Sequence, residues 1–420
     1  MKAYRIATGA RIELYGDPVG EVLIQNLPLA EHQAIAAREA GCVLVDLADD
    51  DALRDLEDPS PHITFPDDLY LSWGLVTAFL DEVRRAPRQP AVLALRRNER
   101  IDALAATQDV DLTDDLMIYP VRYRVPGHHG EPTPLPVDVE DGFPIRKRLP
   151  KHVLATGEVT SYVTSRSILQ IVTPLHLHLA NMAAILNRVA RWSESKGILG
   201  HALGVAQWIG ERLGGGASGR TAAPPIFYKY LQSQNVIGKN CDIHPDAVVE
   251  GCVVGDNVRV GAGSYLQFSH LGDDVDVSAS AVVLSSILGE GTQLVTREWL
   301  SLCVIYPGVF CAPRHMQFGV VGRDAQVFPS MYYDYRLDGR PLKTWFRGEL
   351  VESGFPFMGP VVGHRAKVAG GLSLAAGRLV PNDVVVLPNP DTVVDRIPLD
   401  LAPGSIIHAG MASGPGRGRG

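Results

Sequence analysis

An apolar residue recurs through the second half of the chain with spacings of six, six and five residues, so the pattern repeats every seventeen residues. A glycine follows the first apolar residue of each early repeat. A triangular parallel β-helix needs one inward residue on each short side and a small residue at its corners, whereas helices and alternating strands lack this period. The pattern therefore predicts such a coil over residues 236–310. The inward residues are Ile237, Ile243, Val249, Val254, Val260, Leu266, Leu271, Val277, Val283, Leu288, Leu294, Leu300 and Ile305, and the glycines are Gly238, Gly255, Gly272 and Gly289.

After Ile305 the spacing becomes irregular, and residues 331–359 leave the pattern. Asp338-Gly339 within this excursion is a typical turn of a β-hairpin. We expect the aromatic residues of the excursion to pack on the coil and the residues after Pro388 to cap its end. The period then resumes at Val362, Val368, Leu374, Val380 and Val386.

The first part of the chain has the pattern of an α/β domain. Short apolar runs at residues 43–47, 63–65 and 92–95 predict strands, and helical spacing of apolar residues at 75–83 predicts a crossover helix. Residues 117–150 are rich in proline and predict an irregular span, which is either a lid, an oligomer contact or a surface loop.

A helix is predicted to begin at Pro174, with a second at residues 198–213 and a glycine-rich linker ending at 225. The predicted organisation is a sheet domain over 1–173, a helical region with its linker over 174–225, the coil over 226–400, and a tail over 401–420. The fold class is therefore α/β, with a C-terminal parallel β-helix.

Composition restricts the partners and the cellular location. The formal charge of −8 and the pI near 5.9, without a long basic block, argue against nucleic-acid binding. The five cysteines form no Cys-x-x-Cys pair, so neither a disulfide framework nor a zinc site is expected. No segment has the length and apolarity of a signal peptide or membrane span. We expect a cytoplasmic protein without a membrane partner.

The opening segment MKAYRIATGARIEL resembles the signature of sugar-1-phosphate nucleotidyltransferases, with Gly9 and Arg11 at positions that hold the nucleotide triphosphate. GEVLIQNLPLAEHQAIAAREAGCVLV is similar to that family's next strand, turn and helix, ITFPDDLYLS to its Gly-Asp motif, and QIVTPLHLHLAN to its Asp-x-Gly-Thr-Pro motif. The resemblance implies a Rossmann-like domain that binds a nucleotide sugar or sugar phosphate. It also implies that Asp68, with Asp67 beside it, binds Mg²⁺.

Three parts of this motif set differ from the family. Thr8 and Ala10 stand where the family prefers glycine, and Gly20-Glu21 replaces a Pro-Lys pair. Gln170 stands where a second metal-binding Asp is expected. Because an amide is a weaker Mg²⁺ ligand than a carboxylate, and nucleotidyl transfer depends on charge neutralisation, these differences favour binding over turnover.

The segment GELVESGFPFMGPVVGHRAKVAGGLSLAAGRLVPND is similar to the late coil of bifunctional nucleotidyltransferase/acetyltransferases. This likeness implies a left-handed coil of hexapeptide repeats, a homotrimer or higher homo-oligomer formed through the coil, and acyl transfer from acyl-CoA with a histidine as general base. The candidates are His270, His315 and His364. His315 is the first choice because it lies in CAPRHMQFG, where the register is irregular.

Three functions remain open from the sequence. The first is an enzyme of nucleotide-sugar metabolism, acting as a nucleotidyltransferase or an acyltransferase. The second is a non-catalytic regulatory or scaffold protein of the same architecture, which binds a nucleotide sugar or a protein partner. The third is a purely structural β-helix protein, which leaves the first domain without a role.

Overall fold

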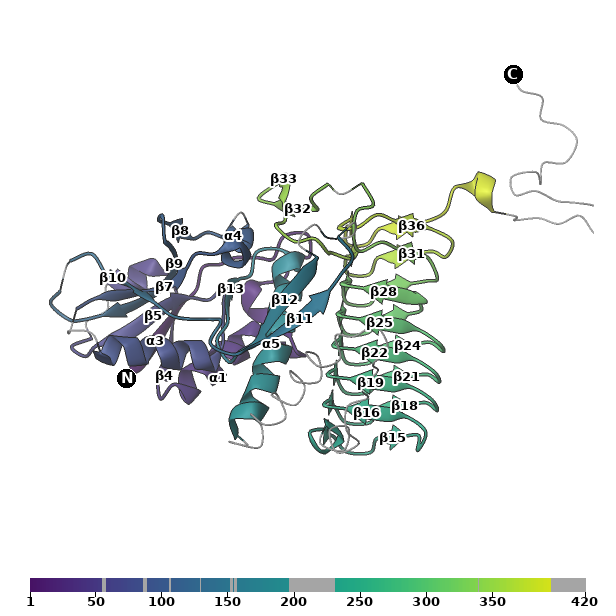
Figure 1. The fold of residues 1–420 in the computed structure, drawn as a ribbon, viewed down its shortest axis with the longest axis horizontal. Coiled ribbons are helices and arrows are strands. Elements are labelled where there is room, and N and C mark those ends of the chain that lie inside the picture. Colours follow the sequence, from purple (N-terminus) through teal and green to yellow (C-terminus); the bar gives the residue numbers. More distant parts are fainter. Residues whose placement is uncertain are drawn as a thin grey trace, which may run out of the picture.

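The chain combines an α/β domain with a tall stack of short parallel strands, as seen in the computed structural model (Figure 1). The structure describes residues 1–195 and 231–393, except 55–57, 86–88, 106, 129, 152–153, 155–156 and 339. The predicted helix at 198–213, the linker at 214–225 and the tail at 401–420 lie outside the described residues. The α/β class and the parallel β-helix are confirmed.

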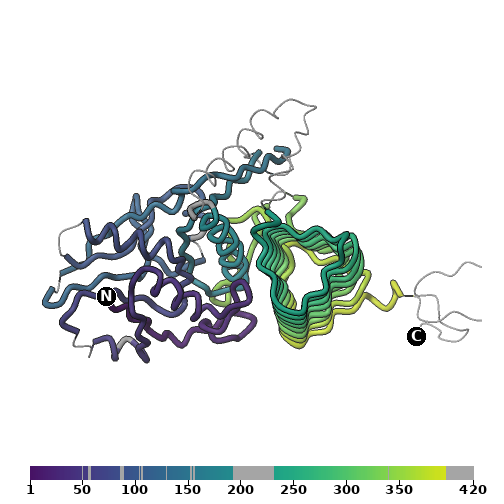
Figure 2. The backbone as a smooth tube through the Cα atoms, turned by 90° about the horizontal axis from the view of Figure 1, so that it is seen from below, coloured from purple at the N-terminus to yellow at the C-terminus, as the bar shows by residue number. Residues whose placement is uncertain are grey.

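The coil consists of three parallel sheets, two of eight strands and one of five, built up as the chain winds in successive stacked turns (Figure 2). The first coil sheet contains β14 (Val236–Ile237), β17 (Val253–Val254), β20 (His270–Leu271), β23 (Ile287–Leu288), β26 (Val304–Ile305), β29 (Val320–Val321), β34 (Val361–Val362) and β37 (Leu379–Val380). The second contains β15 (Asp242–Ile243), β18 (Arg259–Val260), β21 (Asp276–Val277), β24 (Gln293–Leu294), β27 (Phe310–Cys311), β30 (Gln326–Val327), β35 (Lys367–Val368) and β38 (Val385–Val386). The third contains β16 (Val248–Glu250), β19 (Tyr265–Gln267), β22 (Val282–Leu284), β25 (Trp299–Ser301) and β28 (His315–Gln317).

The seventeen-residue period is the strand register itself, since Val254 pairs with Leu271 and Leu271 with Leu288. The predicted inward residues form one continuous apolar core along the coil, from Ile243 to Val386. Ile237 is the exception and is 48% exposed. It belongs to the first turn of the coil, which has a neighbouring turn on one side only.

The corner glycines are required by close approach between successive turns. A Cβ atom on Gly255 would lie 2.3 Å from Oδ1 of Asp273, and one on Gly289 would lie 2.3 Å from the nitrogen of Pro307. Both distances are far below van der Waals contact. Glycine therefore repeats in the sequence because each turn of the coil stacks closely on the next at this corner.

The coil continues through the irregular stretch that follows Ile305. The inward residues Cys311 and Met316 are five positions apart instead of six, and β27 and β28 still pair with the strands before them. β31 (Met331–Tyr332) pairs in parallel with β36 (Ser373–Leu374) and belongs to the coil. The excursion therefore starts after Tyr332, and the predicted start at residue 331 is wrong.

The hairpin of the excursion also differs from the prediction. Its strands are β32 (Lys343–Phe346) and β33 (Glu349–Glu352), and its turn is Arg347-Gly348, with φ angles of 54° and 80°. Two successive positive φ angles suit the tight turns of hairpins. The hairpin therefore does not turn at Asp338-Gly339 as predicted; Gly339 lies outside the described residues, and the Asp338 carboxylate accepts hydrogen bonds from the Arg336 guanidinium.

The aromatic residues of the excursion partly follow the expectation. Phe357 stacks on Phe318 of the coil with ring centroids 5.7 Å apart, and Tyr335 meets Phe357 edge to face. Trp345 on the hairpin is 41% exposed and is an exception.

The first domain is built on a mixed sheet with the order β10-β7-β9-β5-β1-β4. All neighbours are parallel except β9, which runs antiparallel to β5 and β7. The strands are β1 (Lys2–Ile6), β4 (Val43–Leu47), β5 (His62–Pro66), β7 (Ala91–Arg96), β9 (Leu116–Arg124) and β10 (Thr133–Pro136), and the crossover helices are α1 (Leu29–Glu39) and α3 (Trp73–Arg85).

The irregular span predicted at 117–150 is wrong, because much of it forms strands. It contains most of β9, all of β10, and β11 (Phe143–Arg148), which pairs with β12 (Glu158–Val163). Two of its prolines, Pro134 and Pro136, lie in β10 at the edge of the sheet. Proline lacks an N–H group, and an edge strand can do without that donor on its open side.

The first domain and the coil share one apolar core. α5 (Pro174–Ser195), which begins at the predicted residue, and the segment after β1 pack on the first coil sheet (Figure 1). Hydrogen bonds cross the same contact, from Leu23 N to the Tyr306 hydroxyl at 3.0 Å and from the Tyr15 hydroxyl to Val362 O at 3.1 Å. The contact is therefore extensive and well packed. Among the described residues, no helix has both the length and the apolarity needed to cross a membrane.

Candidate functional site

The predicted ligand-binding residues of the first domain gather at one edge of its sheet. β1 lies between β4 and β5 and is parallel to both. The chain leaves β1 on the side of β4 and later returns on the other side as β5. Ligands of open α/β sheets bind where the strand order reverses in this way, outside the carboxyl ends of the strands. Gly9 and Arg11 follow β1, and Asp67 and Asp68 follow β5.

Asp67 holds the loop that carries Gly9. Its Oδ1 accepts hydrogen bonds from Thr8 N at 3.0 Å and from Thr8 Oγ1 at 2.6 Å, and Thr8 Oγ1 also accepts one from Ala10 N at 3.2 Å. Gly9 lies between these bonds, is exposed, and has a φ of +66° with open space around its Cβ position. Thr8, which the family motif does not contain, therefore shapes the loop, and sequence reasoning missed this role.

Arg11 is exposed and bonds within its own loop. Its Nη1 donates to Gly16 O at 2.6 Å, and its backbone forms an antiparallel bridge with Pro18. The guanidinium thus fixes the turn between β1 and α1. In this structure Arg11 supports the loop, while Gly9 presents its open backbone.

Asp68 is buried and faces an amide. Gln170 lies on β13 (Ile168–Gln170), which pairs with β6 (Leu69–Leu71), and its Nε2 donates to Asp68 Oδ2 at 2.7 Å. The Oδ1 atom of Asp68 is buried without a partner. Burial raises the pKa of this carboxyl, although the bond from Gln170 acts in the opposite direction.

The carboxylates at this edge do not fit a Mg²⁺ site. Asp67 uses Oδ1 to hold Thr8, and Asp68 is bonded to Gln170 in a place that disfavours its charged form. Mg²⁺ needs oxygen ligands in near-octahedral geometry. Within the described part of the chain, no group of three or more acidic, histidine or cysteine side chains is arranged to hold a metal ion.

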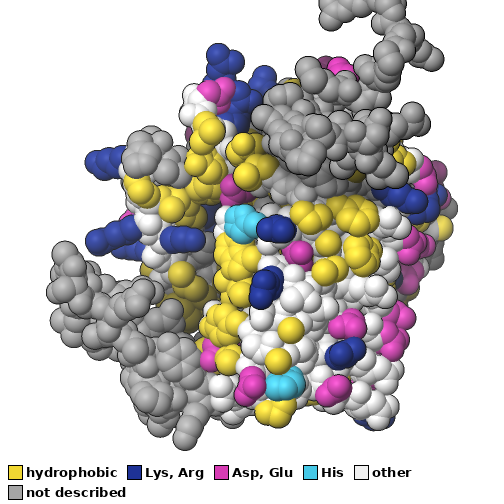
Figure 3. All heavy atoms as spheres, turned by 90° about the vertical axis from the view of Figure 1, so that its right-hand side faces the viewer, with side chains coloured by type: hydrophobic (Ala, Val, Ile, Leu, Met, Phe, Trp, Pro, Cys, Tyr) yellow, Lys and Arg dark blue, Asp and Glu magenta, His cyan; other side chains and the backbone are white. Residues whose placement is uncertain are grey.

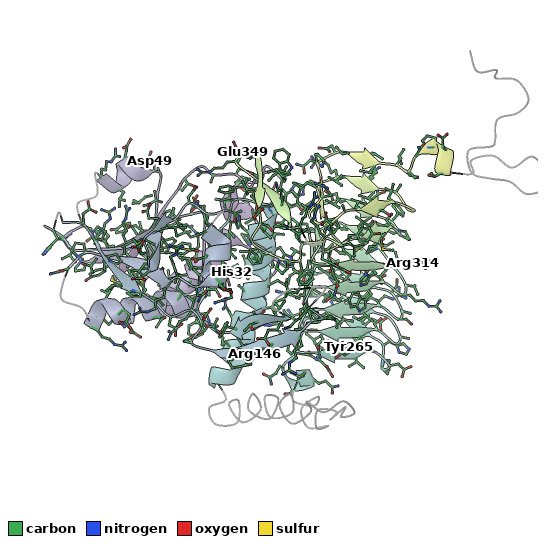
Figure 4. The ribbon with its side chains drawn as sticks, turned by 45° about the horizontal axis from the view of Figure 1, so that its top comes forward. His32, Asp49, Arg146, Tyr265, Arg314 and Glu349 are labelled. Atoms are coloured by element: carbon green, nitrogen blue, oxygen red, sulfur yellow. The ribbon has the colours of Figure 1, made fainter. Side chains whose placement is uncertain are left out.

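A residue of the coil reaches this edge of the first domain. Arg347, at the turn of the β32–β33 hairpin, pairs through Nη2 with the carboxylate of Asp109, and its backbone N donates to Glu13 Oε1 at 2.5 Å. Asp109 N donates to Gln170 Oε1 at 2.6 Å, which connects Arg347 to the Asp68 region. Glu349 on the same hairpin is labelled in Figure 4, near the junction of the two parts. Sequence reasoning missed Arg347 because its partners are more than two hundred positions away.

His315, the predicted acyltransfer base, lies on the third coil sheet and is exposed. Its ring stacks on Trp299 with centroids 4.2 Å apart and an interplanar angle of 13°. Burial lowers its pKa, and the negative charge of Asp334 partly opposes this effect.

On the side of the coil turned away from the first domain, hydrophobic side chains gather in a column (Figure 3).

The two other candidate histidines face the first domain. His364 is 3% exposed, accepts from Arg323 N through Nδ1 at 2.8 Å, and lies 3.1 Å through Nε2 from Oδ2 of Asp17. This arrangement ties the coil to the loop after β1. His270 begins β20 of the first coil sheet, which packs on the first domain.

No protein-family model matches the chain, and no curated protein matches it. The class defined by the structure is an α/β domain joined to a parallel β-helix. Its candidate site lies at the switch point of the sheet, below a hairpin contributed by the coil.

Proposed function

We propose that this chain is a sugar-1-phosphate nucleotidyltransferase-like protein of nucleotide-sugar metabolism that binds a nucleotide sugar or sugar phosphate at the switch point without transferring a nucleotidyl group. The hydrogen bond from Gln170 to Asp68 carries this proposal. It places a neutral amide against the one buried carboxylate of the candidate site. The resemblance of the opening segment and the exposed loop at Gly9 support a ligand of this class.

Binding and transfer make different demands on these residues. A loop with an exposed glycine lets a phosphate approach the backbone closely, which is sufficient for binding. Transfer also requires that charge developing on the phosphate be neutralised by metal ions or cations. Asp68 and Gln170 do not provide the metal site, and the guanidinium of Arg347 is engaged with Asp109.

A thermal-shift panel of nucleotide sugars and sugar phosphates, combined with a pyrophosphate-release assay in Mg²⁺, tests the proposal. At least one ligand raises the melting temperature, and no combination of nucleoside triphosphate and sugar phosphate releases pyrophosphate above the protein-free control. Mg²⁺-dependent release that is lost in Asp68→Asn would establish transfer instead. A panel without any shift would overturn the binding function.

Acyl transfer by the coil is the second candidate, because His315 is exposed and stacked on Trp299 beside Asp334. A lowered pKa keeps the imidazole neutral at pH 7, as a general base requires. Consumption of acetyl-CoA with amino sugars as acceptors, measured for wild type and His315→Ala, tests this candidate. Equal rates in the two proteins would exclude it.

We further propose that the coil is left-handed and that the chain forms a homotrimer in the cytoplasm. The first coil sheet is covered by the first domain, and the second begins its strands mostly with polar residues. The third sheet carries the outward series Val248, Tyr265, Val282 and Trp299, which suits contact with a second copy. Light scattering after size exclusion should give three times 45.4 kDa for wild type and a smaller mass for Trp299→Glu. A wild-type mass of one chain would contradict this assembly.

A further inference from the structure

A half-buried cation lies between α5 and the coil, and no described residue forms an ion pair with it. Arg188 of α5 donates from Nη2 to Gly251 O at 2.6 Å, and its guanidinium lies 5.0 Å from the ring centroid of Trp192. Its Nε and Nη1 atoms are buried and have no hydrogen-bond partner. No ion pair of Arg188 occurs among the residues that the structure describes. Buried guanidinium groups are normally paired with an anion or hydrogen-bonded, so we expect an anionic ligand beside this one.

Two more polar groups at the same contact between the domains are unpartnered. His270 begins β20 on the coil sheet that faces the first domain, and its Nδ1 is buried without a partner. Gln25 lies in the turn between β2 (Leu23–Ile24) and β3 (Leu27–Pro28), and its Nε2 is also buried without a partner. The backbone N of Gln25 donates to Asn181 of α5 at 2.7 Å, while the next residue, Asn26, donates to Leu288 O of the coil at 2.9 Å.

Arg188 supplies a positive charge near His270. Burial lowers the pKa of His270 to about 3, and the charges of Arg188 and His32 act in the same direction. His32 of α1, labelled in Figure 4, contacts the same turn, with Nε2 at 2.6 Å from Ile24 O. Burial also lowers the pKa of Arg188 to about 10, with only Cys252 acting against it.

The unpartnered atoms are suited to an anion. Arginine and the amide nitrogen of glutamine can only donate hydrogen bonds, and a neutral histidine donates from whichever ring nitrogen carries the hydrogen, which can be Nδ1. Arginine nitrogens bind phosphate oxygens with strong, charge-assisted bonds. Water alone would serve the donors but would leave the charge of the guanidinium uncompensated.

We propose that Arg188, His270 and Gln25 form a binding site for a phosphate group, held between α5, the β2–β3 turn and the first coil sheet. The bound group contacts the first domain through Arg188 and Gln25 and the coil through His270. The site is distinct in its residues from the switch point, and the proposal does not depend on the function proposed there.

Thermal unfolding with inorganic phosphate at constant ionic strength tests the site. Phosphate raises the melting temperature of wild type, and the shift is lost in Arg188→Met. Arg191→Met is the matched control, because Arg191 lies on the same helix but pairs at the surface with Glu39 at 2.6 Å. This control retains the shift. An equal shift in Arg188→Met, or no shift in wild type, would overturn the proposal.

Two further arms make the assignment specific. His270→Leu keeps the Arg188 guanidinium and removes one hydrogen-bond donor to the phosphate. The affinity for phosphate, measured by calorimetric titration, should fall at least several-fold, and unchanged affinity contradicts the site. Gly9→Ala alters the switch point and leaves the phosphate shift intact, whereas loss of the shift there would place the anion at the other site and overturn the proposal. The same comparison in Gly9→Ala, with and without Arg188→Met, distinguishes the occupants. A larger Arg188-dependent shift with a sugar phosphate than with inorganic phosphate identifies the phosphoryl group of a small ligand, and an equal or smaller one identifies the free ion.

Discussion

Gln170 donates a hydrogen bond from Nε2 to Oδ2 of Asp68 over 2.7 Å, while its Oε1 accepts from Asp109 N over 2.6 Å. One amide therefore satisfies a buried carboxylate and fixes a neighbouring loop. A carboxylate at position 170 could accept from Asp109 N but could not donate to Asp68. The amide thus stabilises the protein in the absence of a metal ion.

Gln170→Asp should make the stability of the protein dependent on Mg²⁺. Two carboxylates at this distance repel each other, so we expect a loss of roughly 2 kcal/mol in the free energy of unfolding without metal. Millimolar Mg²⁺ should recover much of it, because the pair then has a cation to share. Denaturant unfolding with and without Mg²⁺ measures both effects, with Gln170→Asn as the uncharged control. Equal stabilisation of wild type by Mg²⁺ would show that a metal site already exists.

Arg347→Ala should weaken the binding of an anionic ligand more than it weakens the fold. Its ion pair with Asp109 is solvent-exposed, with side chains 61% and 40% accessible, and such pairs contribute less than about 1 kcal/mol. Without Arg347 the Asp109 carboxylate is left unpaired beside the site and repels an anion, so affinity for a nucleotide sugar should fall roughly tenfold. Calorimetry and thermal melting separate the two effects. Arg340→Ala, in the same excursion, is the control, and equal affinity in both variants would remove Arg347 from the site.

A buried glutamate makes the stability of the coil depend on pH. Glu298 is 4% exposed and occupies the corner position held by Ser264 and Ala281 in the two preceding turns of the coil. Burial raises its pKa from 4.5 to about 7, although Arg314 acts in the opposite direction. Its Oε2 atom is buried without a partner. The folded protein therefore favours the protonated carboxyl.

Because the folded pKa exceeds the unfolded one, the folded state binds more protons between these two values. The free energy of unfolding should fall as the pH rises from about 4.5 to about 7, by up to roughly 3 kcal/mol from this group, and should then level off. Glu298→Gln should lose this contribution, so that the difference between variant and wild type grows with pH over that interval. Urea unfolding at several pH values measures it. A difference independent of pH would refute the raised pKa.

The contact between the domain and the coil should depend on the apolar face of the first coil sheet. Val304 is 1% exposed against the first domain, whereas Val385 on the second sheet is 55% exposed. Val304→Asp should cost more than about 3 kcal/mol, because it buries an unpaired charge. Val385→Asp should change stability by less than about 0.5 kcal/mol. Calorimetric melting compares them, and similar melting temperatures would contradict the contact.

The coil was predictable from the sequence because its contacts are periodic. Each turn meets a copy of the same geometry seventeen residues later, so the inward residues and the corner glycines repeat in register. The continuation of the coil beyond Ile305 was not predicted, because the spacing between the inward residues Cys311 and Met316 is five residues instead of six. A fixed seventeen-residue period does not match a turn that is one residue shorter. The turn at Arg347-Gly348 was missed because Asp338-Gly339 has the stronger local turn signal.

The candidate site was predictable only in part. Gly9 and Asp67 were named because their segments resemble motifs of one family, and the parallel pairing of β1 with β5 then brings them to one edge of the sheet. The hydrogen bonds that decide the chemistry connect distant segments, such as Asp68 with Gln170 and Asp109 with Arg347. Their formation depends on tertiary packing, for which a single sequence carries no local signal.

The most direct measurement is a calorimetric titration of nucleotide sugars into wild type, Gly9→Ala and Gly16→Ala. Gly9 and Gly16 are both exposed, have φ angles of 66° and 79°, and have open space around the Cβ position, so each substitution carries a similar backbone strain of about 1–2 kcal/mol. We expect at least one nucleotide sugar to bind wild type and Gly16→Ala alike and to bind Gly9→Ala at least tenfold more weakly, because the new methyl group keeps the phosphates from the backbone. Equal binding by all three proteins, or no binding by wild type, would contradict it.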